Sequence, residues 1–247
     1  MRTLAFWLLF PLLIPQALWV RRAAPRFGGA PGPRSGRVGS GRRFRLVGLG
    51  DSVIDGVGCA SLETALVGRT AAALAARLDA QIEWSATART GADTRRIRRR
   101  LLPGAAIDAA DFVVVSTGVN DVTGLTRLDD FRTELERLLD DIRARAPSAA
   151  IAINGLPPMH RFPSLPQPLR FTLGLRARQL DAVVAAVADA RAGVKRIAIE
   201  FEAGPEGRAE RFAPDGYHPS ERSCAELAGA ISRALVPSTG SAGTQTA

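Results

Sequence analysis

Short, largely apolar runs alternate with longer segments of helical periodicity along most of this chain. Five such runs occur, at residues 44–49, 81–85, 112–117, 149–154 and 194–199. Short apolar runs separated by helical segments are typical of parallel strands joined by crossover helices. The pattern therefore predicts an α/β fold with five parallel strands.

The segments between these runs carry apolar residues at helical spacing. Three one-sided sets are clear: Leu62, Leu66, Leu74 and Leu78; Phe131, Leu135, Leu138 and Ile142; and Leu173, Leu180, Val184 and Val187. Asp129 is predicted to cap the second helix, and Pro147 follows its end. A last helix is predicted to open at Pro219, since proline suits the first helical position.

The N-terminal pattern is different, because residues 3–20 are almost wholly apolar. Arg2 precedes this run, Arg21 and Arg22 follow it, and Trp7 and Trp19 lie near its ends. Residues 1–22 are therefore predicted to be a membrane segment. A spanning helix, an interfacial helix and a cleaved signal peptide stay open. The absence of a small-x-small site before the arginine pair favours an uncleaved anchor.

The rest of the chain divides into three parts. Residues 23–43 are rich in Gly, Pro, Arg and Ala without apolar periodicity, which predicts a flexible basic tether. Residues 44–236 are predicted to form one globular domain, and residues 237–247 a disordered tail. If the N-terminal segment spans a membrane, eight arginines from position 21 to 45 place the domain on the cytoplasmic side.

The formal net charge of +9 resembles that of a nucleic-acid-binding protein until the charges are located. Residues 1–45 hold nine arginines and no acidic residue, which leaves 24 basic and 24 acidic residues in the remainder. A neutral domain gives no argument for a nucleic-acid partner.

Cys59 and Cys224 are too few for a disulfide framework and lack metal-ligand spacing, so we interpret both as buried, small apolar residues.

Candidate catalytic or binding residues follow the carboxyl end of every predicted strand. Ser52 follows the first strand, Gly91 the second, Asn120 the third, His160 the fourth, and Asp215 with His218 the fifth. Ligands bind at this edge of open α/β sheets, so we expect these residues to surround one site.

Ser52 is the candidate nucleophile, and a nucleophilic serine needs a base. His160 and His218 are the two histidines of the chain, and His218 alone has an acid, Asp215, three residues before it. A third group of this kind fixes the imidazole tautomer in triad chemistry. These residues predict a serine hydrolase, with His160 in a loop at the rim of the cleft.

Other interpretations of the glycine-rich turn at Ser52 are weaker. It lacks the second glycine of the Gly-x-Ser-x-Gly elbow, because Ile54 occupies that place. Val53 breaks the dinucleotide-binding pattern, and the one lysine, Lys195, lies outside any phosphate loop. An ordinary strand-to-helix turn stays open for this segment.

Asn120 has two readings, a helix cap or an amide donor directed at an oxyanion together with the backbone N–H of Gly91. Asp51 and Asp121 could ligate a metal with His218, but no second histidine has suitable spacing. We therefore expect no metal and no cofactor.

A run of arginines follows at positions 95, 96, 98, 99 and 100. These arginines are expected to form a solvated helix face, and the alternative is that they hold an anionic substrate.

Four short blocks, taken in order, resemble those of the SGNH or GDSL-type hydrolase superfamily. They are Gly50-Asp51-Ser52 with Gly56, then Gly91, then Gly118-Val119-Asn120-Asp121, then Asp215-Gly216-Tyr217-His218-Pro219. The resemblance implies a flavodoxin-like, three-layer α/β/α sandwich with a five-stranded parallel sheet. It also implies esterase or lipase activity without a metal.

The same resemblance implies roles for single residues. Ser52 is the nucleophile, His218 the base and Asp215 its orienting acid, while the Ser52 amide, the Gly91 amide and the Asn120 side chain form the oxyanion hole. The expected substrate is a small-molecule, lipid or sugar acyl ester. Two alternatives stay open, a membrane-tethered O-acyltransferase using the same site and a non-catalytic binding module of the same fold.

Overall fold

The computed structural model describes residues 13, 15–16, 28–199 and 210–236 of the chain. The predicted tail, residues 237–247, lies outside the described residues. So does most of the predicted membrane segment.

The described strands form one sheet in the order β1-β3-β2-β4-β5-β6. Their bounds are β1 Ser35–Val38, β2 Arg43–Gly50, β3 Gln81–Ala88, β4 Phe112–Ser116, β5 Ala150–Asn154 and β6 Val194–Ile197. Strands β2 to β6 pair in parallel, whereas β1 pairs antiparallel with β3. All five predicted strands are present, and their parallel arrangement is confirmed.

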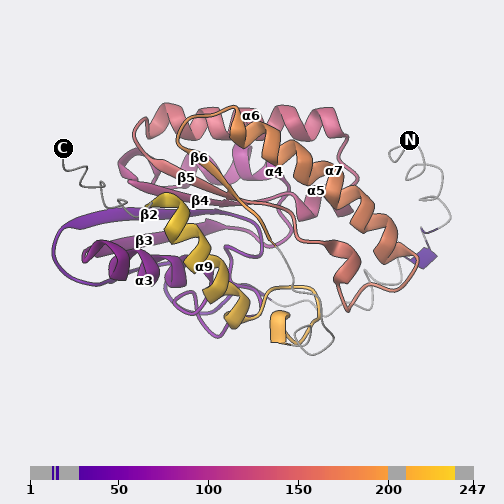
Figure 1. Ribbon diagram of the computed structural model, residues 1–247, viewed down its shortest axis with the longest axis horizontal. Helices are drawn as coiled ribbons and strands as arrows, with labels where there is room; N and C mark the ends of the chain where they lie inside the picture. Colours follow the sequence, from indigo (N-terminus) through magenta and orange to yellow (C-terminus); the bar gives the residue numbers. More distant parts are fainter. Residues whose placement is uncertain (1–12, 14, 17–27, 200–209, 237–247) are drawn as a thin grey trace, which may run out of the picture.

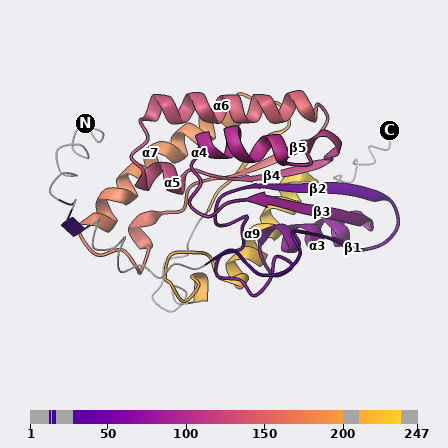
Figure 2. The ribbon, with the colours of Figure 1, turned by 180° about the vertical axis from the view of Figure 1, so that it is seen from behind.

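Helices cover both faces of this sheet, as Figures 1 and 2 show. One face carries α3 (Leu66–Leu78) and α9 (Glu221–Leu235), and the other carries α4 (Thr94–Arg96), α5 (Val119–Thr123), α6 (Leu128–Arg145) and α7 (Leu169–Asp189). Short turns complete the chain path: η2 (Ile97–Leu101), η3 (Leu102–Gly104), η4 (Ile107–Ala109) and η5 (Met159–Arg161). The three-layer α/β/α prediction is confirmed.

Alternation along the strands divides the core into two apolar layers. Val47 and Leu49 of β2 point toward α6 and α7, where they join Phe131 and Leu180 in one buried cluster. Leu46 of the same strand belongs to the opposite cluster, with the inner faces of α3 and α9. Central strands buried on both faces explain why the sequence shows continuous apolar runs rather than clean alternation.

The sheet has six strands rather than five, because β1 adds an antiparallel edge strand. This strand lies inside residues 23–43, so the prediction of a flexible tether is wrong for its second half. The backbone of Gly36 packs on the Trp84 ring of β3, and a side-chain carbon at Gly36 would lie 2.7 Å from that ring. Cross-strand pairing and this contact hold β1 without an apolar face of its own, which is why its sequence shows no strand periodicity.

Two predicted helix starts are also corrected. Arg127 rather than Asp129 is the N-cap of α6, and Asp129 lies in the first turn, where a carboxylate still faces the positive end of the helix dipole. Helix α9 begins after Ser220, whose Oγ accepts a hydrogen bond of 3.2 Å from the Ser223 amide. Pro219 instead pairs with Phe212 in an isolated bridge.

Two described residues of the predicted membrane segment lie against the domain. Leu13 is buried in the cluster beneath α6 and α7. The Gln16 side chain donates to the Gln167 carbonyl (2.9 Å) and accepts from the Leu169 amide (3.1 Å). Within the described part of the chain, no helix combines the length and apolar character that crossing a membrane requires. Membrane attachment through residues 3–20 stays a prediction.

Candidate active site

Ser52 begins the turn that follows β2, at the carboxyl edge of the sheet. The Asp51 amide donates to the Ser116 carbonyl at the end of β4 (3.2 Å), so the turn continues the sheet pairing for one residue. The side chain of Asp51 then accepts from the Val53 amide (3.1 Å) and from the Ser116 hydroxyl (3.0 Å). These bonds fix the backbone on both sides of Ser52, which is 9% exposed.

Asp51 itself is buried, with 1% of its surface exposed. Burial raises the pKa of this carboxyl to about 7, even though the hydrogen bonds from Val53 and Ser116 favour the ionised form. Its hydrogen bonds identify it as a positioning residue for the serine turn.

The histidine loop arranges Asp215 and His218 as a hydrogen-bonded pair. Asp215 Oδ2 lies 2.5 Å from His218 Nδ1, and Oδ1 accepts from the amides of Tyr217 (2.9 Å) and His218 (3.0 Å). Burial alone would raise the pKa of Asp215, but these hydrogen bonds outweigh it and the pKa is lowered. The carboxylate therefore stays ionised and holds the imidazole with Nε2 free to accept a proton.

Aromatic side chains pack against each other beneath the histidine loop, through Tyr217. Tyr217 meets Phe162 edge to face at a centroid distance of 5.1 Å, and Phe162 meets Phe212 in the same way at 5.2 Å. Burial raises the pKa of Tyr217 above its ordinary value, so its hydroxyl stays protonated. The Ser164 hydroxyl also donates to the Gly216 carbonyl (2.9 Å), which ties the loop to the segment after η5.

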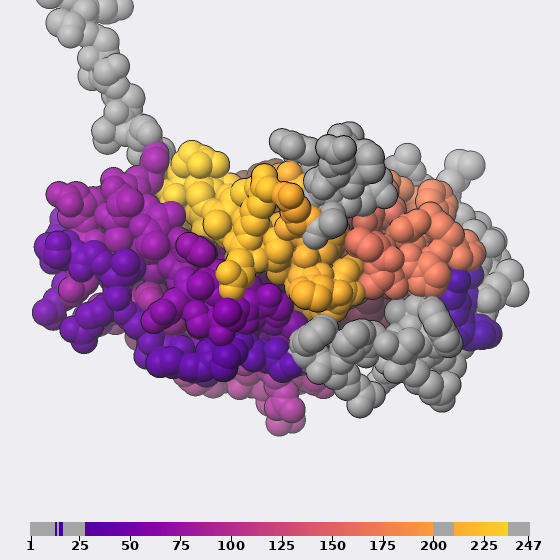
Figure 3. Space-filling model, turned by 90° about the horizontal axis from the view of Figure 1, so that it is seen from below, coloured from indigo at the N-terminus to yellow at the C-terminus, as the bar shows by residue number. Residues whose placement is uncertain are grey.

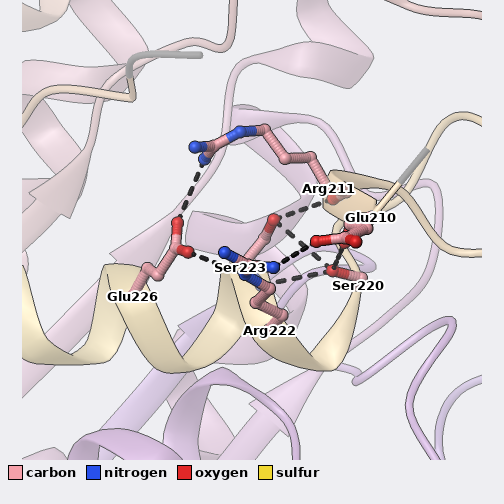
Figure 4. Close-up of polar contacts among 6 residues, drawn as sticks. All are labelled: Glu210, Arg211, Ser220, Arg222, Ser223 and Glu226. Carbon is pink, nitrogen blue, oxygen red and sulfur yellow. Dashed lines mark hydrogen bonds and ion pairs between the residues drawn. The ribbon is translucent and has the colours of Figure 1, made fainter. Parts of the chain in front are cut away.

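Polar contacts anchor the same loop to α9 (Figure 4). The Ser223 hydroxyl donates to the Arg211 carbonyl at 2.8 Å, and Arg211 Nη1 lies 3.0 Å from Glu226 Oε2. Arg222 contacts both Glu226 and Glu210. The first two turns of α9 thereby set the position of the segment that precedes Asp215.

The serine turn and the histidine loop are in direct contact. Gly58 has a φ of 90°, in the left-handed region that favours glycine, and a side-chain carbon there would lie 2.5 Å from the Ala213 Cβ. The His218 Cβ would be 3.7 Å from the same position. Glycine at this position therefore permits the close approach of two segments that are about 160 residues apart in sequence.

Ser52 and His218 line one cavity of about 280 Å³. No hydrogen bond joins the two side chains among the contacts of the described residues, although catalytic hydrogen bonds of this type are often long in the absence of substrate. Asp215 lies behind His218, with its side chain 4% exposed. The structure thus brings the three predicted triad residues to one place.

Gly91 lies in the turn after β3 and Asn120 in α5, and a hydrogen bond joins these two segments. Asn120 Nδ2 donates to the Ala92 carbonyl at 2.9 Å, one residue beyond Gly91. The amides of Ser52 and Gly91 have no acceptor among the described residues, and Gly91 has a φ of 79° with open space where a side chain would project. Neither Gly91 nor Asn120 is part of the cavity wall that Ser52 and His218 share.

Asp121 ties the segment of Asn120 to Thr94. Its Oδ2 accepts from the Thr94 amide (3.0 Å) and the Thr94 hydroxyl (2.8 Å), and burial raises its pKa. Across the residues that the structure describes, no group of three or more His, Cys, Asp or Glu side chains is arranged to hold a metal ion.

Other predicted residues lie away from the cavity. His160 packs against Gly174 of α7, where a side-chain carbon would be 2.6 Å from the His160 Cβ, and it is not among the residues that line the cavity. Burial and the charges of three nearby arginines lower the pKa of His160.

Cys224 is buried as expected, whereas Cys59 is partly exposed. The two free thiols lie 3.9 Å apart.

The arginine cluster after Thr94 is only partly a solvated face. Arg98 pairs with Glu134 (2.8 Å) and Asp141 (3.4 Å) of α6, and Arg95 and Arg99 also lie within 4.0 Å of Glu134. These ion pairs pack the segment against α6.

Sequence reasoning missed Asn154, which ends β5 and lines the cavity. It follows the same rule as Ser52 and Asn120, a polar residue at the carboxyl end of a parallel strand, so the signal was present. Phe162 and Phe212 were missed as well, because loop residues give no periodic pattern.

A serine at the end of the first parallel strand, on one cavity with a histidine that has its own carboxylate, is the arrangement of a serine hydrolase built on a three-layer α/β/α sandwich. Comparison with known proteins agrees. The sequence profile of the GDSL-like Lipase/Acylhydrolase family matches residues 49–223. The chain belongs to this family and is a serine hydrolase acting on esters.

A curated relative and several solved structures are similar to the chain. GDSL-like esterase Rv1075c of Mycobacterium tuberculosis is 31% identical over 232 residues, which cover 85% of this chain and 71% of that protein. The lipase Lip_vut3 from a goat rumen metagenome has a TM-score of 0.59 at 18% identity, covering 77% of this chain and 97% of that one. A family 3 carbohydrate esterase of Clostridium thermocellum has a TM-score of 0.56 at 20% identity, covering 78% and 99%. These two structures support the fold.

Proposed function

We propose that the protein hydrolyses carboxylic esters through an acyl-enzyme on Ser52. His218 Nε2 takes the proton of the Ser52 hydroxyl as Oγ attacks the ester carbonyl, and returns it to the leaving alcohol. Water, activated by the same imidazole, then attacks the acyl-enzyme and releases the acid. The observation that carries this proposal is the Asp215–His218 pair on the cavity that Ser52 lines.

The negative charge that develops on the carbonyl oxygen needs donors. The Ser52 and Gly91 amides suit this role because neither has an acceptor among the described residues. Asn120 Nδ2 has a second hydrogen, since its bond to the Ala92 carbonyl uses one of the two. Together these three donors would stabilise the oxyanion.

Replacing Ser52 by alanine tests the nucleophile. Ser52→Ala should abolish hydrolysis of p-nitrophenyl acetate and butyrate, while its thermal melting point stays near that of the wild type. Ser61→Ala is the matched control, because Ser61 lies in the same segment and bonds to Thr64. Full activity in Ser52→Ala would exclude Ser52 as the nucleophile.

The choice of esters in this assay follows from the relatives. The solved structures similar to this chain include lipases and a carbohydrate esterase, so the panel should contain fatty acyl esters and acetylated sugars. Product analysis with added alcohol acceptors separates hydrolysis from acyl transfer, because only transfer forms a new ester.

A further inference from the structure

The cavity that Ser52 and His218 share continues between the sheet and α9. Leu227 and Ala230 of α9 form one wall, and Phe162 and Phe212 form another. In Figure 3, α9 (yellow) crosses the lower surface between the purple segment that carries α3 and the salmon segment that includes η5. A cavity of about 280 Å³ with mainly apolar walls suits one short group of an ester substrate.

Several polar side chains lie among these apolar ones, and Asn154 differs from the rest in its hydrogen bonding. Asn154 is the last residue of β5, paired with Ile197 of β6, and it lines the cavity. It is 2% exposed, and neither its Oδ1 nor its Nδ2 has a hydrogen-bond partner in the structure. Among the buried side chains of the described residues, Asn154 is the one whose amide oxygen and nitrogen are both unpaired.

Other buried polar groups near this edge of the sheet are paired. The Ser116 hydroxyl donates to Asp51, Thr94 donates to Asp121, and Asn120 donates to the Ala92 carbonyl. Buried polar groups in native proteins are nearly always paired, because an unpaired one loses its hydration without compensation. An aliphatic residue at position 154 would avoid that loss, so the amide needs a partner from outside the chain.

We propose that Asn154 determines substrate specificity by hydrogen-bonding a hydroxyl or carbonyl group on the part of the ester that enters this cavity. An amide both donates and accepts, which matches a hydroxyl group fully and a carbonyl through Nδ2. A plain alkyl chain would leave both amide atoms unpaired in the complex. The preferred substrate is therefore an ester whose short cavity-bound group carries an oxygen substituent. This inference rests on the proposed ester hydrolysis at Ser52.

Paired esters test the inference on either side of the scissile bond. The acyl arm compares p-nitrophenyl 3-hydroxybutyrate with p-nitrophenyl butyrate, and the alcohol arm compares 2-hydroxypropyl acetate with propyl acetate, followed by acid release. In one of the arms, wild-type kcat/KM should favour the oxygen-bearing ester by tenfold or more, since a site that hydrogen-bonds a substrate hydroxyl discriminates against its absence.

Asn154→Leu should remove that preference, while kcat/KM for the unsubstituted ester stays the same or rises. Leu227→Ala is the control, because loss of an apolar wall residue should affect both esters alike and leave their ratio unchanged. If Asn154→Leu does not fold, Asn154→Ala replaces it. The wild-type ratio of kcat/KM between the oxygen-bearing and the unsubstituted ester is then compared with the ratio in Asn154→Ala. Comparable stability of the variant by thermal melting excludes a folding effect.

The possible failures are distinguishable. Absence of Ser52-dependent hydrolysis on all four esters would overturn the proposed function. Ser52-dependent hydrolysis with a ratio near one in both arms, or a ratio that Asn154→Leu leaves intact, would overturn the role of Asn154 and assign its partner to solvent.

Discussion

The buried carboxyl of Asp51 should make the stability of this protein depend on pH in an unusual direction. Burial raises its pKa from 3.8 to about 7 in the folded state. The unfolded chain therefore releases this proton near pH 4, whereas the folded chain keeps it until about pH 7. Proton binding to Asp51 therefore stabilises the folded state. This contribution to the free energy of unfolding is fully present below the unfolded pKa and is lost as pH rises through the folded pKa.

The size of the effect follows from the shift. About three pKa units correspond to roughly 4 kcal/mol between pH 4 and pH 8, at about 1.4 kcal/mol per unit. Most of this, about 3 kcal/mol, falls between pH 5 and pH 8, because the first unit of the window lies below pH 5. Asp51→Asn removes the titration but keeps an oxygen that can accept from Val53 and Ser116.

Urea unfolding of wild type and Asp51→Asn at pH 5, 6, 7 and 8 measures the prediction. The difference in unfolding free energy should move by about 3 kcal/mol in favour of the variant as pH rises. Asp129→Asn, at an exposed position in α6, is the matched control for the exchange of Asp for Asn. A flat difference for Asp51→Asn, or one that moves toward the wild type, would refute the reasoning about burial.

Three further predictions concern the site and the N-terminus. Asp215→Asn should lower kcat roughly 10⁴-fold, because the amide would favour the wrong imidazole tautomer; a loss below tenfold in p-nitrophenyl butyrate kinetics would argue against His218 as the base. Asn120→Ala should lower kcat by about 10²-fold or more with little change in KM, and a change confined to KM would instead indicate a role in binding. Deleting residues 3–20 should move the protein from the membrane to the soluble fraction on centrifugation. If the protein divides between the two fractions as before, residues 3–20 are not a membrane anchor.

The parallel strands could be predicted because they are buried on both faces. Runs such as Val113 to Val115 carry no polar residue, and the helices between them show clear one-sided periodicity. The β1 strand could not be predicted in this way. It is held by edge pairing and by contact of Gly36 with Trp84, and neither depends on an apolar pattern.

The candidate site was predictable where chemistry and chain position coincide. Ser52, Asp215 and His218 combine a reactive group with a place at the end of a strand or in a short acid–histidine spacing. The carboxyl ends of parallel strands meet at one edge, so topology brings them together. The cavity wall was not predictable, because Phe162, Phe212 and Leu227 come from a loop, a bridge and a helix whose relative positions depend on tertiary packing.

Peptide mapping after fluorophosphonate labelling shows whether Ser52 is the nucleophile. A fluorophosphonate reacts with a serine whose hydroxyl is activated by a base. We expect one adduct, on the peptide that contains Ser52, and its loss in His218→Ala. An adduct on another serine, or a protein that hydrolyses esters yet leaves Ser52 unlabelled, would contradict it.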